Sequence, residues 1–192
     1  WVDWLKRTIP QAIYELIECG YNLYDFMRLA VVILKHQPDV IYERHNLYFV
    51  SGIWAQKIFR RPLLLEVNAP LYQERKQFNT IALDRLAQWS EHYVWKNADC
   101  VLPVTEVLAG IIKSEVRPKA LEVIHNGVSL DELVVTSSAE EMRRQYGLTN
   151  QIILGFVGFV RDWHRLELII DYISRRPTMS LVLMIVGEGP DC

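Results

Sequence analysis

The chain has 192 residues, of which 51% are hydrophobic and 23% are charged, and its net charge is −2. These values are typical of soluble globular domains and exclude a general attraction to nucleic acid or to an anionic membrane. The three cysteines lie far apart in the sequence, which favours a reducing compartment and excludes a disulfide scaffold or a cysteine zinc site.

Helical and extended patterns alternate along the first two thirds of the chain. We expect helices at residues 10–19, 23–36, 47–59, 72–96 and 105–114, and strands at residues 40–42, 63–67, 100–104 and 122–125. Gly20 is expected to end the first helix, and Thr105 is expected to cap the last. This alternation predicts parallel β-α-β units with right-handed crossovers.

A polar segment then interrupts the alternation, and we interpret residues 131–150 as a linker that contains a short helix ending at Gly147. A second domain starts at residue 151, with strands at 152–157 and 181–186 and a helix between them. The first domain, residues 1–130, lacks strands at its start, and two strands with one helix are too few for a stable domain. We therefore expect a fragment of two Rossmann-like domains.

The turn after the strand at residues 152–157 has the pattern of an anion site. Gly158 allows close approach to the backbone, and Arg161 and His164 precede the start of a helix. The ligand that this pattern suggests is a phosphate or pyrophosphate. Plain turn chemistry is the alternative, because neither G-x-G-x-x-G nor a Walker lysine loop is present.

Six segments in order resemble the GT4 family of retaining glycosyltransferases, which have the GT-B fold. They are PDVIYER (38–44), LEVNAPL (65–71), ADCVLPVTEVL (98–108), VIHNGVSLDEL (123–133), LGFVGFVRDWH (154–164) and LVLMIVGEGP (181–190). The resemblance implies an α/β protein with two doubly wound parallel-sheet domains, both incomplete in this chain. Residues 1–130 would be the acceptor-side domain, and residues 151–192 would begin the nucleotide-sugar domain.

The resemblance also implies transfer of a sugar, with retention, from a nucleotide sugar to a glycan or lipid-linked acceptor, with no metal or other cofactor. The implied site residues are Gly158, Arg161 and His164 for the donor diphosphate, Asn126, Gly127 and Gly187 for the donor-side cleft, and Glu66 and Asn68 for the acceptor side. The catalytic residues stay unidentified. We expect a cytoplasmic protein without nucleic-acid partners, and the sequence leaves open whether the full-length enzyme docks on a membrane.

Simpler interpretations stand beside these roles. Arg161 could pair with Asp162 at the surface, and Glu66 could be a buried, paired carboxylate. The glycines could serve only turns, which we favour for Gly189. Glu43 and Arg44 are expected to form a structural ion pair.

Several positions depart from the family pattern. Phe159 replaces an arginine, Arg165 stands where a glycine is expected, and Ser129 replaces an aspartate. The E-x7-E segment of the family would lie beyond Cys192, so we expect this chain by itself to be inactive. Two alternatives stay open: another nucleotide-sugar enzyme of this fold, such as an epimerase or a phosphorylase, and a non-catalytic degenerate module.

Overall fold

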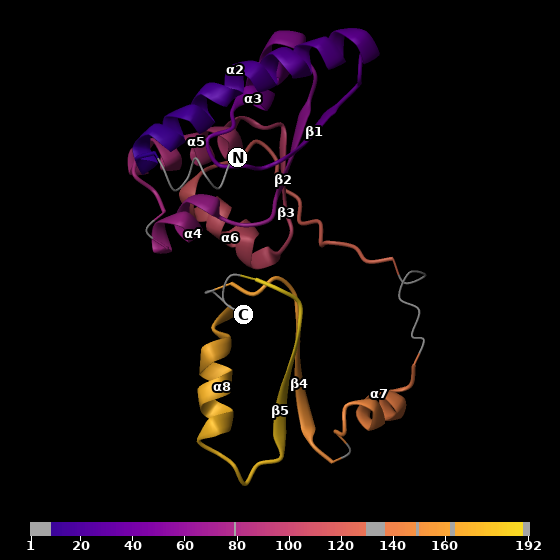
Figure 1. Cartoon of the computed structure of the whole chain (residues 1–192). Coiled ribbons are helices and arrows are strands. Elements are labelled where there is room, and N and C mark those ends of the chain that lie inside the picture. The colour runs from indigo at the N-terminus through magenta and orange to yellow at the C-terminus, as the bar shows by residue number, and fades with distance from the viewer. Residues whose placement is uncertain (1–8, 79, 130–136, 149, 162–163, 190–192) are drawn as a thin grey trace. The chain divides into compact units, whose positions relative to one another are not determined.

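The computed structural model describes residues 9–78, 80–129, 137–148, 150–161 and 164–189. The chain divides into two compact units, unit 1 (Trp1–Val128) and unit 2 (Ser129–Cys192), and each has its own parallel sheet (Figure 1). The predicted linker at residues 131–150 falls within unit 2 and includes residues outside the described ranges. Its role as a linker stays a prediction.

The sheet of unit 1 has the strand order β1-β2-β3, with all strands parallel. The strands are β1 (Ile41–Arg44), β2 (Leu63–Val67) and β3 (Cys100–Pro103). The strand expected at residues 122–125 is wrong as a regular strand. That segment runs along β3 through an isolated bridge between Val101 and Leu121 and a few backbone hydrogen bonds.

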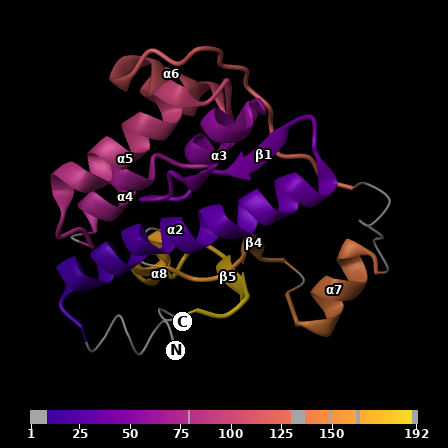
Figure 2. The same cartoon turned by 90° about the horizontal axis from the view of Figure 1, so that it is seen from above.

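The helices of unit 1 differ from the expected ones mainly in where they begin and end. They are α2 (Gln11–His36), α3 (Ser51–Phe59), α4 (Leu71–Gln77), α5 (Asp84–Asn97) and α6 (Glu106–Glu115). The two helices predicted before residue 37 are one continuous helix, so the predicted stop at Gly20 is wrong. An interior glycine costs a helix only about 1 kcal/mol, and packing of α2 along α3 outweighs that cost (Figure 2).

The start of α3 depends on a side chain from α2. We predicted a helix from residue 47, but the helix begins at Ser51, and Tyr48 has a positive φ of 69°. The side-chain oxygen of Asn22 accepts hydrogen bonds from the backbone N–H groups of Val50 (2.6 Å) and Ser51 (3.0 Å). Asn22 therefore caps α3 from another helix, although the N-cap residue Val50 has no capping side chain of its own.

A second distant cap divides the long helix that we predicted at residues 72–96. The carboxylate of Glu15, which is fully buried, accepts hydrogen bonds from the N–H groups of Ala82 (2.8 Å) and Leu83 (2.7 Å). These groups lie directly before α5, so the chain enters α5 at Asp84 rather than continuing from α4. The predicted cap of α6 is confirmed, because the Thr105 hydroxyl accepts from the N–H of Leu108 at 3.1 Å.

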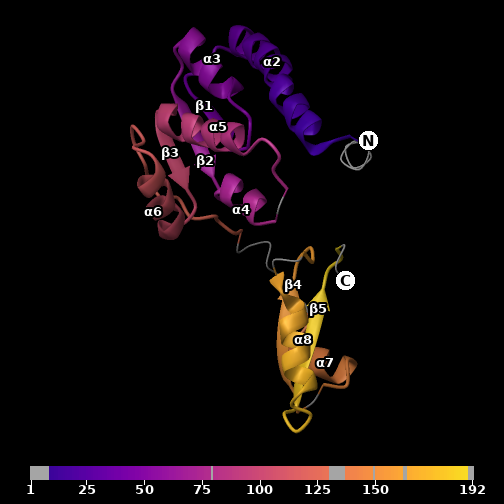
Figure 3. The ribbon, with the colours of Figure 1, turned by 90° about the vertical axis from the view of Figure 1, so that its left-hand side faces the viewer.

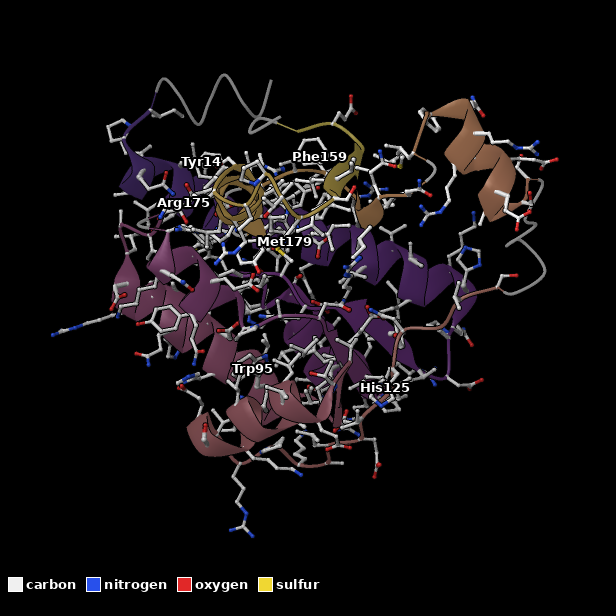
Figure 4. All side chains as sticks on the ribbon, turned by 90° about the horizontal axis from the view of Figure 1, so that it is seen from below. Tyr14, Trp95, His125, Phe159, Arg175 and Met179 are labelled. Carbon is white, nitrogen blue, oxygen red and sulfur yellow. The ribbon has the colours of Figure 1, made fainter. Side chains whose placement is uncertain are left out.

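The core of unit 1 lies between one face of its sheet and the helices. Leu63, Leu65 and Val67, which alternate along β2, are at most 1% exposed and pack with residues of α3, α5 and α6. Trp95 of α5, labelled in Figure 4, is 1% exposed within this cluster. Residues 64 and 66 of β2 therefore lie on the opposite face of the sheet.

Unit 2 contains a parallel β-α-β arrangement preceded by a short capped helix. Its elements are α7 (Ala139–Gln145), β4 (Ile152–Val157), α8 (Leu166–Ser174) and β5 (Leu181–Val186). Both predicted strands are confirmed residue for residue, and α8 lies beside them (Figure 3). None of the described helices is long and apolar enough to cross a membrane.

Candidate functional site

The loops that follow β4 and β5 pair with each other at the carboxyl ends of these strands. The N–H of Gly158 donates to the carbonyl oxygen of Val186 at 3.0 Å. Beyond it, the N–H of Val160 donates to the carbonyl oxygen of Glu188 at 2.8 Å. Open parallel sheets bind their ligands at this end of the strands. Gly158 and Gly187, which were predicted for the donor side, therefore lie at the expected edge of the sheet.

Close backbone contact explains why glycines occupy these loops. Gly158 and Gly187 have φ angles of +153° and +150°, which side-chain-bearing residues rarely adopt. A Cβ atom on Gly187 would overlap the carbonyl group of Gly158, and one on Gly189 would overlap the backbone of Val160. Turn and packing requirements therefore account for Gly187 and Gly189, and a ligand role for Gly187 stays a prediction.

The structure brings Arg161 and His164 together in one short turn before α8. The N–H of Arg161 donates to Nδ1 of His164 at 3.1 Å, and the N–H of His164 donates to the carbonyl oxygen of Arg161 at 2.9 Å. Because Nδ1 accepts a hydrogen bond, a neutral His164 carries its ring proton on Nε2. The ring of His164 is also held edge-on to Phe156, at a centroid distance of 4.8 Å.

The Arg161 side chain lies against Phe159, one of the residues that depart from the family pattern. The guanidinium carbon is 4.4 Å from the centroid of the Phe159 ring, within cation–π distance. Sequence reasoning did not foresee this contact. The alternative pairing of Arg161 with Asp162 lies outside the described residues.

The residue directly before α8 has an unusual backbone conformation. Arg165, the N-cap of α8, has a left-handed φ of 53°, which glycine adopts without strain. This conformation explains why a glycine is expected at this position. The Arg165 side chain is exposed and pairs with Glu167 at 2.7 Å.

Glu66, which was predicted for the acceptor side, lies near the end of β2 and is the centre of a polar cluster. Its carboxylate accepts hydrogen bonds from the hydroxyl of Tyr42 (2.5 Å) and from Nδ2 of Asn68 (2.6 Å). Arg44 Nε lies 3.8 Å from the same carboxylate. The hydrogen bonds from Tyr42 and Asn68, with the charge of Arg44, hold the pKa of Glu66 below its usual value. Glu66 is paired, as one alternative proposed, but it is only half-buried.

Sequence reasoning missed Tyr42 and assigned Arg44 to the wrong partner. Tyr42 and Arg44 lie on one face of β1, and parallel pairing places Arg44 opposite Glu66. The predicted ion pair between Glu43 and Arg44 is therefore wrong, because adjacent residues of a strand point to opposite faces. The alternation of side chains along residues 42–44 could have excluded the pairing of Glu43 with Arg44, but it does not identify Glu66 as the partner.

Glu43 points to the opposite face, where its carboxyl group packs against Gly52 of α3. No hydrogen-bond partner is found for its buried Oε2 atom among the residues that the structure describes. Burial, and then the nearby charge of Asp25, raises the pKa of Glu43 to about 7.

Asn126 and Gly127 lie in an exposed segment at the end of unit 1. The preceding residue, His125, is labelled in Figure 4, and its Nδ1 lies 2.9 Å from the carbonyl oxygen of Val104. A Cβ atom on Gly127 would meet nothing within 4 Å, so packing does not require this glycine. The predicted place of both residues in a donor-side cleft stays a prediction.

Comparisons with known proteins give one family and one similar fold. The model of Glycosyltransferase Family 4 matches residues 7–132, which include Glu66 and Asn68. The chain is similar in structure to Anabaena Alr3699/HepE, which was crystallised in complex with UDP and glucose, with a TM-score of 0.62 and 23% sequence identity. The match covers 84% of this chain and 43% of HepE, so the chain spans less than half of that protein. No curated protein matches. The predicted α/β fold of GT-B type is confirmed.

Proposed function

Because the chain belongs to glycosyltransferase family 4, we propose that the protein transfers a hexose from a nucleotide sugar to a glycan or lipid-linked acceptor, with retention. The observation that carries the donor half of this proposal is the turn of Arg161 and His164 before α8. The HepE complex with UDP and glucose supports UDP as the first nucleotide to test.

The chemistry of that turn suits a diphosphate. The guanidinium of Arg161 is always charged and can bind phosphate oxygens through two hydrogen bonds. The first turn of α8 carries a partial positive charge and its N-cap residue makes no side-chain capping hydrogen bond, and His164 has a donor at Nε2. Together these groups would stabilise the negative charge that develops on the departing nucleoside diphosphate. We propose that they do so without a metal ion or other cofactor.

Arg161 also bears on the replacement of the family's arginine by Phe159. The family usually has an arginine directly after the glycine, whereas here Arg161 lies over the Phe159 ring. We infer that the phenyl ring orients the guanidinium, so that a residue two positions later supplies the missing charge.

On the acceptor side, Glu66 would orient the acceptor rather than remove its proton. A general base works best with a pKa near the operating pH, and the pKa of Glu66 is lowered. Its carboxylate, held by Tyr42 and Asn68, would accept hydrogen bonds from sugar hydroxyl groups.

Calorimetric titration of UDP into the chain tests the donor half. We expect Arg161→Ala to weaken UDP binding about tenfold, which corresponds to about 1.4 kcal/mol, and Arg161→Lys to weaken it less. Arg175→Ala is the matched control, because Arg175 is exposed at the other end of α8 and pairs with Asp171 (Figure 4). Equal UDP affinities for Arg161→Ala and the unchanged chain would contradict the proposed role, as would absence of UDP binding by the folded chain.

A further inference from the structure

A groove on the outer side of α5 belongs to none of the sites described above. It has a volume of about 510 Å³ and is lined by Trp89, His92, Tyr93, Lys96, Asn97 and Val116. All of these residues except Val116 come from α5, and Val116 follows α6. The groove therefore lies between the outer face of α5 and the end of α6.

Two aromatic rings stack on each other in this groove. Trp89 and Tyr93 are one helical turn apart and stack with a centroid distance of 5.1 Å and an interplanar angle of 24°. Trp89 is 53% exposed although it is a large apolar side chain. More than half of the Trp89 side chain therefore stays exposed to solvent although it stacks on Tyr93.

Neighbouring residues hold this aromatic pair in place. The Tyr93 hydroxyl accepts a hydrogen bond from Nζ of Lys57 at 3.0 Å, and the same ammonium group lies 5.1 Å from the centre of the Tyr93 ring. The Trp89 ring is thus held in position on Tyr93 before a ligand arrives, which lowers the entropy cost of binding.

The charges around the groove are mainly positive. Lys96 lines it, and Lys57 lies at its edge. The acidic residue in contact with His92 is Glu115, and it is already engaged, with an oxygen 2.9 Å from Nε2 of His92 and a hydrogen bond from Gln73. A ligand that carries a carboxylate or phosphate therefore meets cations and no unpaired carboxylate among the lining residues that the structure describes.

We propose that this groove binds a saccharide chain that carries acidic groups. The apolar C–H face of a sugar ring fits a flat, exposed aromatic surface, and the acidic group would lie near Lys96. Concave sites that combine an apolar floor with a few polar groups are typical of small-ligand binding. The choice of a saccharide rests on the proposed glycosyl transfer, but the groove itself is a second site outside that reaction.

The groove is separate from the acceptor-side cluster. The chain leaves α5 at Asn97, and the carboxylate of Asp99 then accepts a hydrogen bond from the N–H of Leu63, at the amino end of β2. Glu66 and Asn68 lie at the opposite, carboxyl end of that strand. A saccharide chain bound on α5 would hold a long glycan on the protein without occupying the acceptor cluster.

Binding to an array of neutral, hexuronic-acid and phosphorylated oligosaccharides tests this inference. We expect the chain to bind acidic oligosaccharides, Trp89→Ala to weaken binding at least tenfold, and Trp89→Phe to retain part of it. Lys96→Gln should weaken binding of acidic oligosaccharides more than of neutral ones. Tyr24→Ala, at an exposed aromatic residue of α2, is the control and should bind normally. Circular dichroism verifies that each variant is folded.

Binding of UDP by the same variants separates this inference from the proposed function. Trp89→Ala should bind UDP normally, and Arg161→Ala should bind oligosaccharides normally. Loss of one binding activity therefore does not imply loss of the other. The inference is overturned if the folded chain binds no oligosaccharide or if Trp89→Ala binds them unchanged. It is also overturned if Trp89→Ala instead abolishes self-association in ultracentrifugation or binding to phosphatidylglycerol vesicles, because a second copy or a membrane would then be the occupant.

Discussion

Nε2 of His45 lies 3.0 Å from a carboxylate oxygen of Glu91, and the two side chains are only 2% and 1% exposed. The same carboxylate accepts a hydrogen bond from the backbone N–H of Tyr72 at 3.1 Å, in the first turn of α4. His45 directly follows β1, and Tyr72 follows the loop that carries Asn68. Glu91 therefore joins the two loops that follow β1 and β2, at the carboxyl ends of these strands.

Loss of the Glu91 carboxylate should destabilise unit 1 strongly. Glu91→Ala removes the acceptor of the buried Tyr72 N–H and the contact with the buried His45 ring, and each unsatisfied buried polar group costs about 1–3 kcal/mol. Glu91→Gln keeps an acceptor for Tyr72 and should cost less. Urea unfolding followed by tryptophan fluorescence measures both, with Glu122→Ala as an exposed control. Similar free energies of unfolding for the alanine and glutamine variants would show that the hydrogen bonds contribute little.

The cap that α2 provides to α3 should be a second point of sensitivity. Asn22 also donates to the carbonyl oxygens of Cys19 and Tyr48, at 2.9 and 2.8 Å. Asn22→Ala removes all of these bonds and should lower the free energy of unfolding by about 3 kcal/mol, since each unsatisfied buried group costs about 1–3 kcal/mol. Hydrogen exchange at Val50 and Ser51 should accelerate.

The control for this substitution is Asn46→Ala, at an exposed position beyond β1. If Asn22→Ala destabilises the chain while Val50 and Ser51 keep their protection, the effect is general packing and the capping role is wrong.

Glu43 should make the stability of unit 1 fall as the pH rises. Its pKa is raised in the folded state to about 7, so between about pH 4.5 and 7 the folded chain binds more protons than the unfolded chain. Glu43→Gln resembles the protonated form. Near pH 4 its free energy of unfolding should equal that of the unchanged chain. At pH 8 it should be higher by up to about 3 kcal/mol, because each tenfold change in proton affinity corresponds to about 1.4 kcal/mol.

Glu66 provides the contrast, because its pKa is lowered. Its carboxylate stabilises the fold above its unfolded pKa and loses this effect as the pH falls, so Glu66→Gln should destabilise at pH 8 and have no effect at low pH. Denaturant titrations at pH 4, 6 and 8 measure both variants. A pH-independent difference between Glu43→Gln and the unchanged chain would exclude Glu43 as the titrating group.

Two glycine substitutions should act in opposite directions. Gly20 lies within α2, and a Cβ atom there meets nothing within 4 Å. Gly20→Ala should therefore stabilise unit 1 by about 0.5–1 kcal/mol, the difference in helix preference between the two residues. Gly52→Ala should destabilise it, because the new Cβ would overlap the Glu43 carboxylate. Thermal unfolding measures both changes, and destabilisation by Gly20→Ala would mean that α2 needs flexibility at that point.

Most of the strands and the predicted pairs of site residues could be predicted from the sequence because the patterns that indicate them are local. The runs at residues 63–67, 152–157 and 181–186 are continuously apolar or nearly so, which is typical of parallel strands. Arg161 with His164, and Glu66 with Asn68, are three and two residues apart, so any compact turn brings them together. Tyr42 and Arg44 reach Glu66 only through the register of β1 against β2, which no single segment encodes.

The sequence by itself determined the alternation of strands and helices, the family resemblance and the composition of the candidate turns, because these depend on residue order alone. Only the tertiary structure decided where α3 and α5 begin. The acceptors at these starts are Asn22 and Glu15, which lie 28 to 68 positions from the N–H groups that they bind. Unsatisfied N–H groups at a helix start need an acceptor. Where the neighbouring residues offer none, the packing of distant helices supplies it.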